Sequence, residues 1–195
     1  MFKNKKPVIA VFCGSKSGKK DIYTQKTQEI SSILTKNSYQ IIYGGGRTGL
    51  MGNLSKVVKK EKGNITGVIP SFLNNPKLVQ SDLSYLYDVK SLSIRKKLMI
   101  DKSDIIIILP GGFGTLDELM ELLTLIQTKK IKKRLPIVLY GKEFWEKLIN
   151  WDYLVDIGTI SNEDLELFHI SKDVNDAYNY VTTFIEKHQL KGPNF

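Results

Sequence analysis

The stretch Asp104-Ile-Ile-Ile-Ile-Leu-Pro-Gly-Gly-Phe-Gly-Thr-Leu-Asp-Glu118 decides the fold of this 195-residue chain. Residues 104–109 form an apolar run that fits a buried strand, and apolar residues at helical spacing follow over 115–128. The glycines between these two segments predict a tight turn from strand to helix. A strand that is apolar throughout is typical of a parallel sheet covered on both faces.

The same alternation of strand and helix continues in both directions along the chain. Short apolar runs predict further strands at residues 7–13, 40–43, 65–69, 85–89 and 135–140. Amphipathic stretches predict helices at residues 20–36, 48–62, 91–102, 142–150 and 172–188. This order indicates an α/β fold: a doubly wound, mostly parallel, Rossmann-like sheet with helices on both faces. We expect a single domain over residues 1–195, with frayed tails at 1–6 and 189–195.

Composition excludes several classes of protein. Hydrophobic residues make up 42% of the chain and charged residues 25%, so a disordered chain or a collagen-like repeat is excluded. The lone Cys13 cannot form an internal disulfide, which favours a reducing compartment. The apolar run 8–13 is shorter than the roughly 7–15 residues of a signal peptide, and no stretch approaches the roughly 18 of a spanning helix. We therefore expect a soluble, cytoplasmic protein without a membrane partner.

The net charge of +9 suggests an anionic partner. The basic cluster Lys129-Lys-Ile-Lys-Lys-Arg134 is compatible with nucleic acid, or with a solvated helix end where cations complement the dipole. We favour the helix end, because no aromatic residues are interleaved with these cations, and we expect no nucleic-acid partner.

Glycines follow three of the predicted strands, at Gly14, at 44–46 and at 111–114. The carboxyl ends of parallel strands share one edge, where ligands bind, and glycine lets a ligand approach the backbone. The pattern Gly44-x-Gly46-x-x-Gly49 formally matches a dinucleotide fingerprint, but the acidic residue expected about 20 positions later is missing. This turn therefore serves either packing or a nucleotide or phosphate contact.

The turn Pro110-Gly-Gly-Phe-Gly-Thr115 lacks the Gly-Lys-Ser/Thr of a P-loop, yet it joins strand to helix as a phosphate cradle does. Two structural alternatives remain open. Thr115-x-x-Glu118 also fits a capping box, in which Glu118 bonds back to the backbone of Thr115. Asp117 and Glu121 also fit simple complements to the helix dipole.

Pro110-Gly-Gly-x-Gly-Thr-x-x-Glu118 resembles the PGGxGTxxE signature of the LONELY GUY family, whose members are often mislabelled "lysine decarboxylase". Four further segments resemble the family in order and spacing, so the resemblance covers roughly residues 7–185: Val11-Phe-Cys-Gly-Ser15, Tyr43-Gly-Gly-Gly-x-x-Gly-Leu-Met-Gly52, Ser91-Leu-Ser-Ile-Arg-Lys-Lys-Leu-Met99 and Gly158-Thr-Ile-Ser-Asn-Glu-Asp164.

The resemblance implies a cytokinin riboside 5′-monophosphate phosphoribohydrolase, which splits an N6-modified adenosine monophosphate, or AMP, into free base and ribose 5-phosphate. It implies no cofactor, because water is the only co-substrate. Arg95 and Glu118 match the catalytic pair. The resemblance implies substrate contacts at Lys96, Gly111, Gly112, Gly114, Thr115 and Thr124, and we add Gly45 and Gly46 of the second glycine turn. A non-catalytic nucleotide-binding or sensing protein of similar fold is the alternative.

Three positions depart from the family pattern. Ser93 stands where His is common, Leu92 where Met is common, and Lys77 near the position of a frequent Glu. These departures bear on the choice of base more than on the chemistry.

The proposed chemistry agrees with the residue types. Cleavage of an N-glycosidic bond develops positive charge on the ribose, which a carboxylate such as Glu118 can stabilise. Arg95 offers a permanent charge, although a surface ion pair would also explain it. His169 and His188 lack metal-ligand spacing, so we expect no metal and regard His169 as structural. Cys13 is expected to be a small buried residue rather than a nucleophile.

Helix 116–126 is apolar over more than one stripe. A second buried face predicts a homodimer or higher homo-oligomer built partly on this helix. A helix lying deep in the core is the other explanation.

Overall fold

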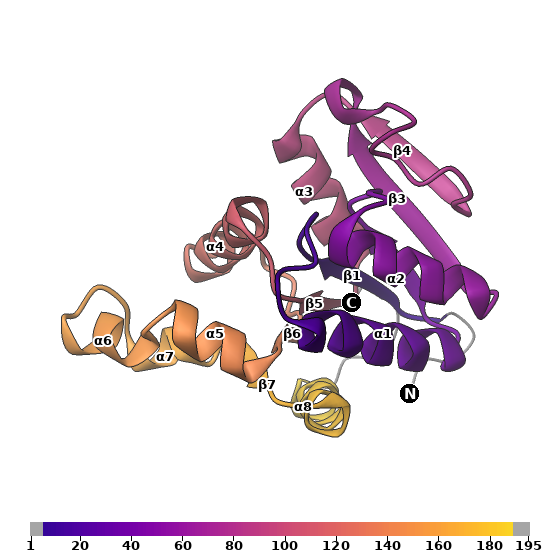
Figure 1. The fold of residues 1–195 in the computed structure, drawn as a ribbon. Helices are drawn as coiled ribbons and strands as arrows, with labels where there is room; N and C mark the ends of the chain where they lie inside the picture. Colours follow the sequence, from indigo (N-terminus) through magenta and orange to yellow (C-terminus); the bar gives the residue numbers. More distant parts are fainter. Residues whose placement is uncertain (1–5, 189–195) are drawn as a thin grey trace.

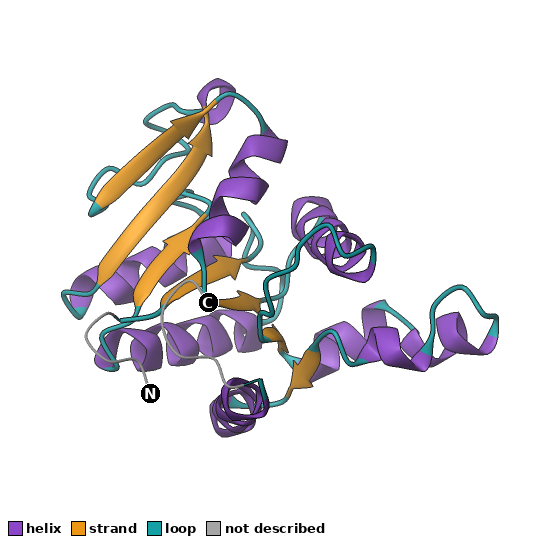
Figure 2. Ribbon diagram, turned by 180° about the vertical axis from the view of Figure 1, so that it is seen from behind, coloured by secondary structure: helices purple, strands orange, loops and turns teal. Residues whose placement is uncertain are grey.

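The computed structural model describes residues 6–188, so the predicted tails lie outside the described part except for Lys6. Within these residues a seven-stranded sheet has the order β4-β3-β2-β1-β5-β6-β7, and every pairing is parallel (Figures 1 and 2). The prediction of a doubly wound α/β fold is confirmed. The strands are β1 (Val8–Phe12), β2 (Gln40–Tyr43), β3 (Asn64–Pro70), β4 (Tyr85–Val89), β5 (Ile105–Ile108), β6 (Ile137–Tyr140) and β7 (His169–Ser171).

Helices cover both faces of the sheet, as predicted. One apolar core joins the sheet to α1, α2 and α8, and a second core joins it to α3, α4 and α5. The helices are α1 (Asp21–Lys36), α2 (Gly49–Lys60), α3 (Leu92–Lys102), α4 (Phe113–Gln127), α5 (Lys142–Leu148), α6 (Trp151–Asp156), α7 (Asn162–Leu165) and α8 (Val174–Lys187), with a short 3-10 turn at Ser71–Leu73.

The central strands are apolar throughout because they are buried on both faces. In β5, Ile105 and Ile107 pack into the α1–α2–α8 core, whereas Ile106 and Ile108 pack into the α3–α4–α5 core. Successive side chains of a strand point to opposite faces of the sheet. A strand between two helical layers therefore needs apolar side chains on both faces and does not alternate apolar with polar residues.

The order of the sheet reverses between β1 and β5. From β1 the chain builds outward through β2, β3 and β4, and it then returns to add β5, β6 and β7 on the other side. The loops after β1 and β5 stay in contact, because the N–H of Gly14 donates to the carbonyl of Pro110 at 3.1 Å. Ligands of open α/β sheets bind at such a reversal, beyond the carboxyl ends of the strands.

The chain between β6 and β7 differs from the prediction. The helix expected at 142–150 ends at Leu148, and α6 and α7 follow before a three-residue strand that was not predicted. Polar caps start the two extra helices: Asn150 accepts from the N–H of Tyr153, and Ser161 forms a capping box with Asp164. Figure 1 shows α5, α6 and α7 extending sideways beyond β7. None of the helices between residues 6 and 188 is long and apolar enough to cross a membrane.

Candidate functional site

Helices α3 and α4 bring Arg95 and Glu118 together. The Nη2 atom of Arg95 lies 3.6 Å from Oε1 of Glu118, and only 12% and 9% of the two side chains are exposed. Arg95 lies in the first turn of α3, which Ser91 caps by accepting the N–H of Ile94. Glu118 lies in the second turn of α4, which begins directly after the glycine turn of β5. The pair is therefore enclosed, so a surface ion pair does not describe it.

Burial dominates the electrostatics of Glu118. It raises the pKa of this carboxyl group from 4.5 to about 7, against the opposing effect of the Arg95 guanidinium. Cys13, at the end of β1, is also buried, and burial together with the nearby Glu118 carboxylate raises the pKa of its thiol. Cys13 is thus a buried neutral residue, as predicted, and Glu118 can exchange a proton near neutral pH.

The second glycine turn makes room for Arg95 at Gly44. A Cβ atom there would lie 1.9 Å from Nη2 of Arg95, so a side chain at this position would displace the guanidinium. The Nε atom of Arg95 is buried and has no hydrogen-bond partner within residues 6–188. Sequence reasoning placed Gly44 in the turn but not among the site residues, because the clash depends on a helix about 50 residues later.

Gly45 and Gly46 lie on the packed side of the same turn. Gly45 has a φ of +76°, and a Cβ atom there would face Ile69 at 3.6 Å. Gly46 packs against Met51 and forms an antiparallel bridge with Val79. A Cβ atom on either of these two predicted substrate contacts would therefore face protein side chains, whereas one on Gly44 would meet the Arg95 guanidinium.

The glycines of the PGGxGTxxE loop differ in what surrounds them. A Cβ atom on Gly111 would lie 2.1 Å from Oγ1 of the buried Thr115, so this glycine is required by packing. A Cβ atom on Gly112 or Gly114 would meet nothing within 4 Å. These two glycines border open space at the start of α4, where the first N–H groups of a helix lack intrahelical partners and attract anions.

The capping-box interpretation of Thr115 and Glu118 is wrong. Helix α4 begins at Phe113 with Gly112 as its N-cap, so Thr115 already lies inside the helix. The helix begins two residues before the predicted start at Thr115, because Phe113 and Gly114 of the glycine turn are already helical. Phe113, in the middle of the loop, is 94% exposed, which no pattern in the sequence indicates.

Lys96 connects α3 to α4 rather than facing the glycine loop. Its ammonium group contacts Oδ2 of Asp117 at 2.7 Å and also pairs with Glu121, and the residue is buried. The interpretation of Asp117 and Glu121 as helix-dipole residues missed this pair. The cross-link fixes the two helices next to the contact between Arg95 and Glu118.

Thr124 lies away from the pair within this chain. Its hydroxyl group donates to the carbonyl of Met120 at 2.7 Å. It borders a hollow of about 80 Å³ between α4 and the α6–α7 segment, together with Trp151 and Asp164.

The three departures from the family pattern lie on exposed positions. Leu92 and Ser93 occupy the first turn of α3, and Lys77 lies in the loop after Ser71–Leu73, where its N–H donates to Oδ1 of Asn75. This loop contacts the second glycine turn, because Arg47 donates to the carbonyl of Pro76.

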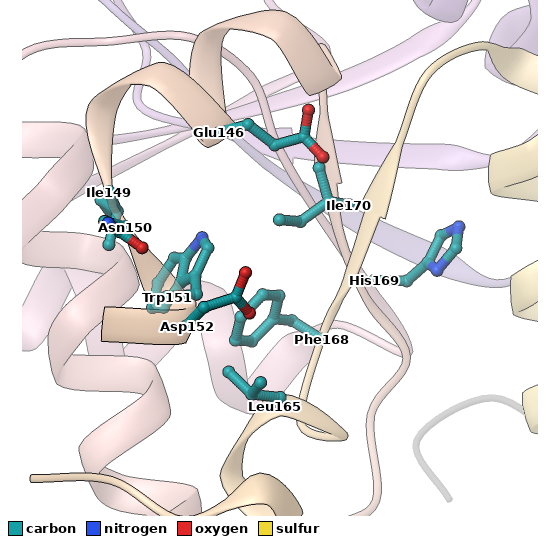
Figure 3. Close-up of a pocket in the computed structure, with 9 residues that line it drawn as sticks. All are labelled: Glu146, Ile149, Asn150, Trp151, Asp152, Leu165, Phe168, His169 and Ile170. Atoms are coloured by element: carbon teal, nitrogen blue, oxygen red, sulfur yellow. The ribbon is translucent and has the colours of Figure 1, made fainter. Parts of the chain in front are cut away.

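A separate cavity of about 400 Å³ lies between α5, α6 and β7 and holds none of the predicted site residues. Figure 3 shows the rings of Trp151 and Phe168 close together inside it, with the Glu146 side chain on another side. His169 borders this cavity, but its Nε2 atom contacts Asp176 at 3.0 Å and its ring stacks on Tyr180, in agreement with a structural role. The part of the chain that the structure describes contains no group of three His, Cys, Asp or Glu residues placed to hold a metal ion.

The fold is similar to that of solved cofactor-binding proteins. A molybdenum cofactor binding protein from Rippkaea orientalis matches with a TM-score of 0.70 and 17% identity, over 94% of this chain and 99% of that chain. The molybdenum cofactor carrier protein of Chlamydomonas reinhardtii matches with a TM-score of 0.66 and 21% identity, over 93% and 99%. At these identities the likeness shows the fold alone.

Sequence relatives are closer. The protein described as "Cytokinin riboside 5'-monophosphate phosphoribohydrolase LOG5" of Arabidopsis thaliana is 35% identical over 162 residues, which are 82% of this chain and 70% of that protein. LOG2 of the same plant, described as the same enzyme, is 30% identical over 182 residues, 92% and 84% of the two chains. The probable phosphoribohydrolase LOGL9 of Oryza sativa subsp. japonica is 36% identical over 119 residues, and the chain spans about half of that relative's length (52%).

A family model described as "Possible lysine decarboxylase" matches residues 51–181, more than half of the chain. This range contains the Arg95–Glu118 pair and the whole glycine loop at the start of α4. Together with the relatives above, the match shows that the chain belongs to the LONELY GUY (LOG) family.

Proposed function

We propose that this protein is a nucleoside 5′-monophosphate phosphoribohydrolase that cleaves the N-glycosidic bond of AMP or of an N6-modified, cytokinin-type AMP. The products are the free base and ribose 5-phosphate. The names of the relatives support this reaction class. The observation that carries it is the enclosed Arg95–Glu118 pair, located beside an open helix N-terminus at the reversal of the sheet.

The start of α4 is suited to the 5′-phosphate. Its first N–H groups are free of intrahelical bonds, and the helix dipole favours an anion there. Gly112 and Gly114 leave space for the phosphate to approach the backbone. This part of the site binds the substrate in both its ground state and its transition state.

Glu118 is placed to act on C1′, the carbon at which the bond breaks. It lies five residues after Phe113, about 7.5 Å along the helix axis. Phosphate and C1′ belong to the same ribose, so a phosphate at the helix start brings C1′ near this carboxylate. As the C1′–N9 bond breaks, its electron pair leaves with the base and positive charge develops on the ribose, which Glu118 stabilises. The carboxylate also orients the attacking water and takes its proton as the new C1′–O bond forms.

Arg95 is suited to the other side of the ribose or to the departing base. Its guanidinium contacts Glu118, while Nε lacks a partner within the described residues. A fixed cation beside Glu118 keeps a fraction of this carboxyl group ionised despite its burial. It can also donate to the base as negative charge builds on it.

We also propose that the protein forms a homodimer through the outer face of α4. Leu119 and Leu122 of this helix are buried in the α3–α4–α5 core, but Met120 is 39% exposed and Leu123 is half-buried. The helix is therefore not wholly inside the core of its own chain.

The decisive experiment incubates the protein with AMP and with isopentenyladenosine monophosphate and measures free base and ribose 5-phosphate by chromatography. The wild type is expected to release both products. Glu118→Ala is expected to lower the rate about 100-fold or more, since a positioned carboxylate contributes that much. The matched control Glu186→Ala removes an exposed carboxylate on α8 and is expected to keep the wild-type rate.

Release that survives in Glu118→Ala would refute the proposed site. Tight nucleotide binding without any release by the wild type would instead identify a non-catalytic nucleotide-binding protein. Circular dichroism of each variant separates loss of chemistry from loss of fold.

A further inference from the structure

A second cavity, which we call the basic cavity, lies at the amino ends of the strands, opposite to the end where Arg95 and Glu118 lie. It measures about 880 Å³ and is bordered by residues in the ranges 126–135, 163–168 and 180–188. These segments are the end of α4 with the loop into β6, the approach to β7, and the end of α8. The cavity therefore lies at the amino ends of β6 and β7, whereas the candidate site lies beyond the carboxyl ends of β1 and β5.

Four exposed cations border the basic cavity: Lys129, Lys132, Arg134 and Lys187. No carboxylate within residues 6–188 lies within 4.0 Å of any of them, although several other lysines of the chain are paired in this way. Like charges held on one concave surface repel each other, and a bound anion would relieve that repulsion.

Helix dipoles explain only part of this cluster. Lys129 and Lys187 lie at the C-terminal ends of α4 and α8, where cations are favourable in any protein. Lys132 and Arg134 lie in the loop beyond α4, so the dipole does not account for them. Lys133 of the same loop also borders the cavity, but its ammonium group is engaged: it donates to the carbonyl of Ser103 and lies 3.8 Å from Asp104.

Aromatic side chains form the apolar part of the cavity wall. Tyr180 and Phe184 come from α8, and Phe168 comes from the residue before β7. In the sequence, the lack of interleaved aromatic residues favours a solvated helix end over a nucleic-acid site at residues 129–134. The fold supplies these residues from a helix about 50 positions later.

Arg134 is held in place at the edge of the cavity. Its guanidinium donates to Nδ1 of His188, and the pKa of His188 is lowered by burial and by the nearby Arg134 and Lys187. The imidazole therefore stays neutral and accepts this bond, while the remaining donors of Arg134 form a fork of the kind that binds phosphate.

We infer that the basic cavity binds a nucleotide that carries two or more phosphates, with the phosphates on Lys132 and Arg134 and the base against Phe184. Four cations without a carboxylate partner among residues 6–188 exceed what one phosphate needs, and the aromatic wall fits a planar base. The volume is in the range of small-molecule sites. Glu163 and Glu166 border the cavity as well, and they would repel the continuing backbone of a nucleic-acid strand.

The experiment is isothermal titration calorimetry of the full-length protein with ATP, with AMP, with inorganic tripolyphosphate and with a single-stranded dT oligonucleotide. Glu118→Gln in the background prevents hydrolysis at the candidate site. The double variant Lys132→Gln/Arg134→Gln is expected to bind ATP about tenfold or more weakly, because two charged phosphate contacts are lost. The control Lys56→Gln/Lys60→Gln removes the same charge from exposed positions on α2 and is expected to bind ATP as the parent does.

Phe184→Leu is expected to weaken ATP binding about fivefold or more but not tripolyphosphate binding, because the base loses the aromatic ring on which it stacks. Equal ATP affinity in the two double variants would overturn the proposal. If tripolyphosphate binds as tightly as ATP, the cavity recognises any polyanion and the proposal of a nucleotide site is wrong. If the oligonucleotide binds more tightly than ATP, the cavity is instead part of a nucleic-acid surface. Hydrolysis assayed in the wild-type background is a separate readout, so failure here leaves the proposed function unaffected.

Discussion

Burial of Glu118 makes the stability of the protein depend on pH. Its carboxyl group has a folded-state pKa of about 7 against an ordinary value of 4.5, because the group is buried. The folded protein thus binds a proton that the unfolded chain releases between these pH values, so the free energy of unfolding falls as pH rises from 4.5 to 7. Above pH 7 the cost in stability of keeping the buried carboxylate ionised is constant, and below pH 4.5 this cost vanishes.

Glu118→Gln is expected to remove this cost. The variant should be more stable than the wild type at pH 8, by about 3 kcal/mol at most for a shift of this size. Near pH 4.5 the two proteins should have similar stability. Urea unfolding at both pH values measures the difference, and Glu186→Gln, an exposed position, serves as the control. A difference that does not depend on pH would show that the folded-state pKa of Glu118 is not raised.

The glycine loop at the start of α4 offers a test at the scale of an element. Gly114 lies inside the helix, and a Cβ atom there would meet nothing within 4 Å. Gly114→Ala is therefore expected to leave stability unchanged or raise it by about 0.5–1 kcal/mol, since alanine is the better helix former. If the 5′-phosphate lies against this turn, the same methyl group should raise KM for AMP about tenfold.

Gly111→Ala is the contrasting variant, because its Cβ atom would clash with Thr115 and should lower the melting temperature. An unchanged KM in Gly114→Ala would place the phosphate elsewhere. The two glycines of one motif thus separate packing from ligand binding.

Elements that bury apolar residues in periodic patterns were predictable from the sequence. The runs that became β1, β5 and β6 are apolar because two helical layers cover them, and that pattern is local. The strand β7 was missed because His-Ile-Ser has only three residues and no apolar run. Helices α6 and α7 were missed because they have only six and four residues and begin at polar caps.

The candidate site was predictable only through its motif. Nothing local indicates that Arg95 and Glu118 touch, because their contact depends on the packing of α3 against α4. The same packing turns Lys96 toward Asp117 and Glu121, and it brings the guanidinium of Arg95 against Gly44. Contacts between helices carry no periodic signal in a single sequence.

At the scale of the whole molecule, the question is what covers α4. Phe113 is 94% exposed at its start and Met120 is 39% exposed seven residues later, so an apolar strip follows the outer face of the helix. Figure 1 shows the α5–α7 segment extending away from the sheet, and Tyr153 and Ile157 of that region are also exposed. Exposed apolar residues that follow one face of a helix are typical of an interface.

Met120→Glu is expected to convert a dimer into a monomer. The substitution places a charge in the middle of the proposed interface, and burial of an unpaired carboxylate costs several kcal/mol. Size-exclusion chromatography with light scattering measures the mass of each protein, and the wild type should show twice the 22.2 kDa of one chain. Tyr178→Glu places the same charge on a more exposed position of α8 (56% against 39% for Met120) and should remain a dimer. A monomeric wild type would contradict the proposal, whereas a dimer that survives Met120→Glu but not Tyr178→Glu would move the interface from α4 to α8.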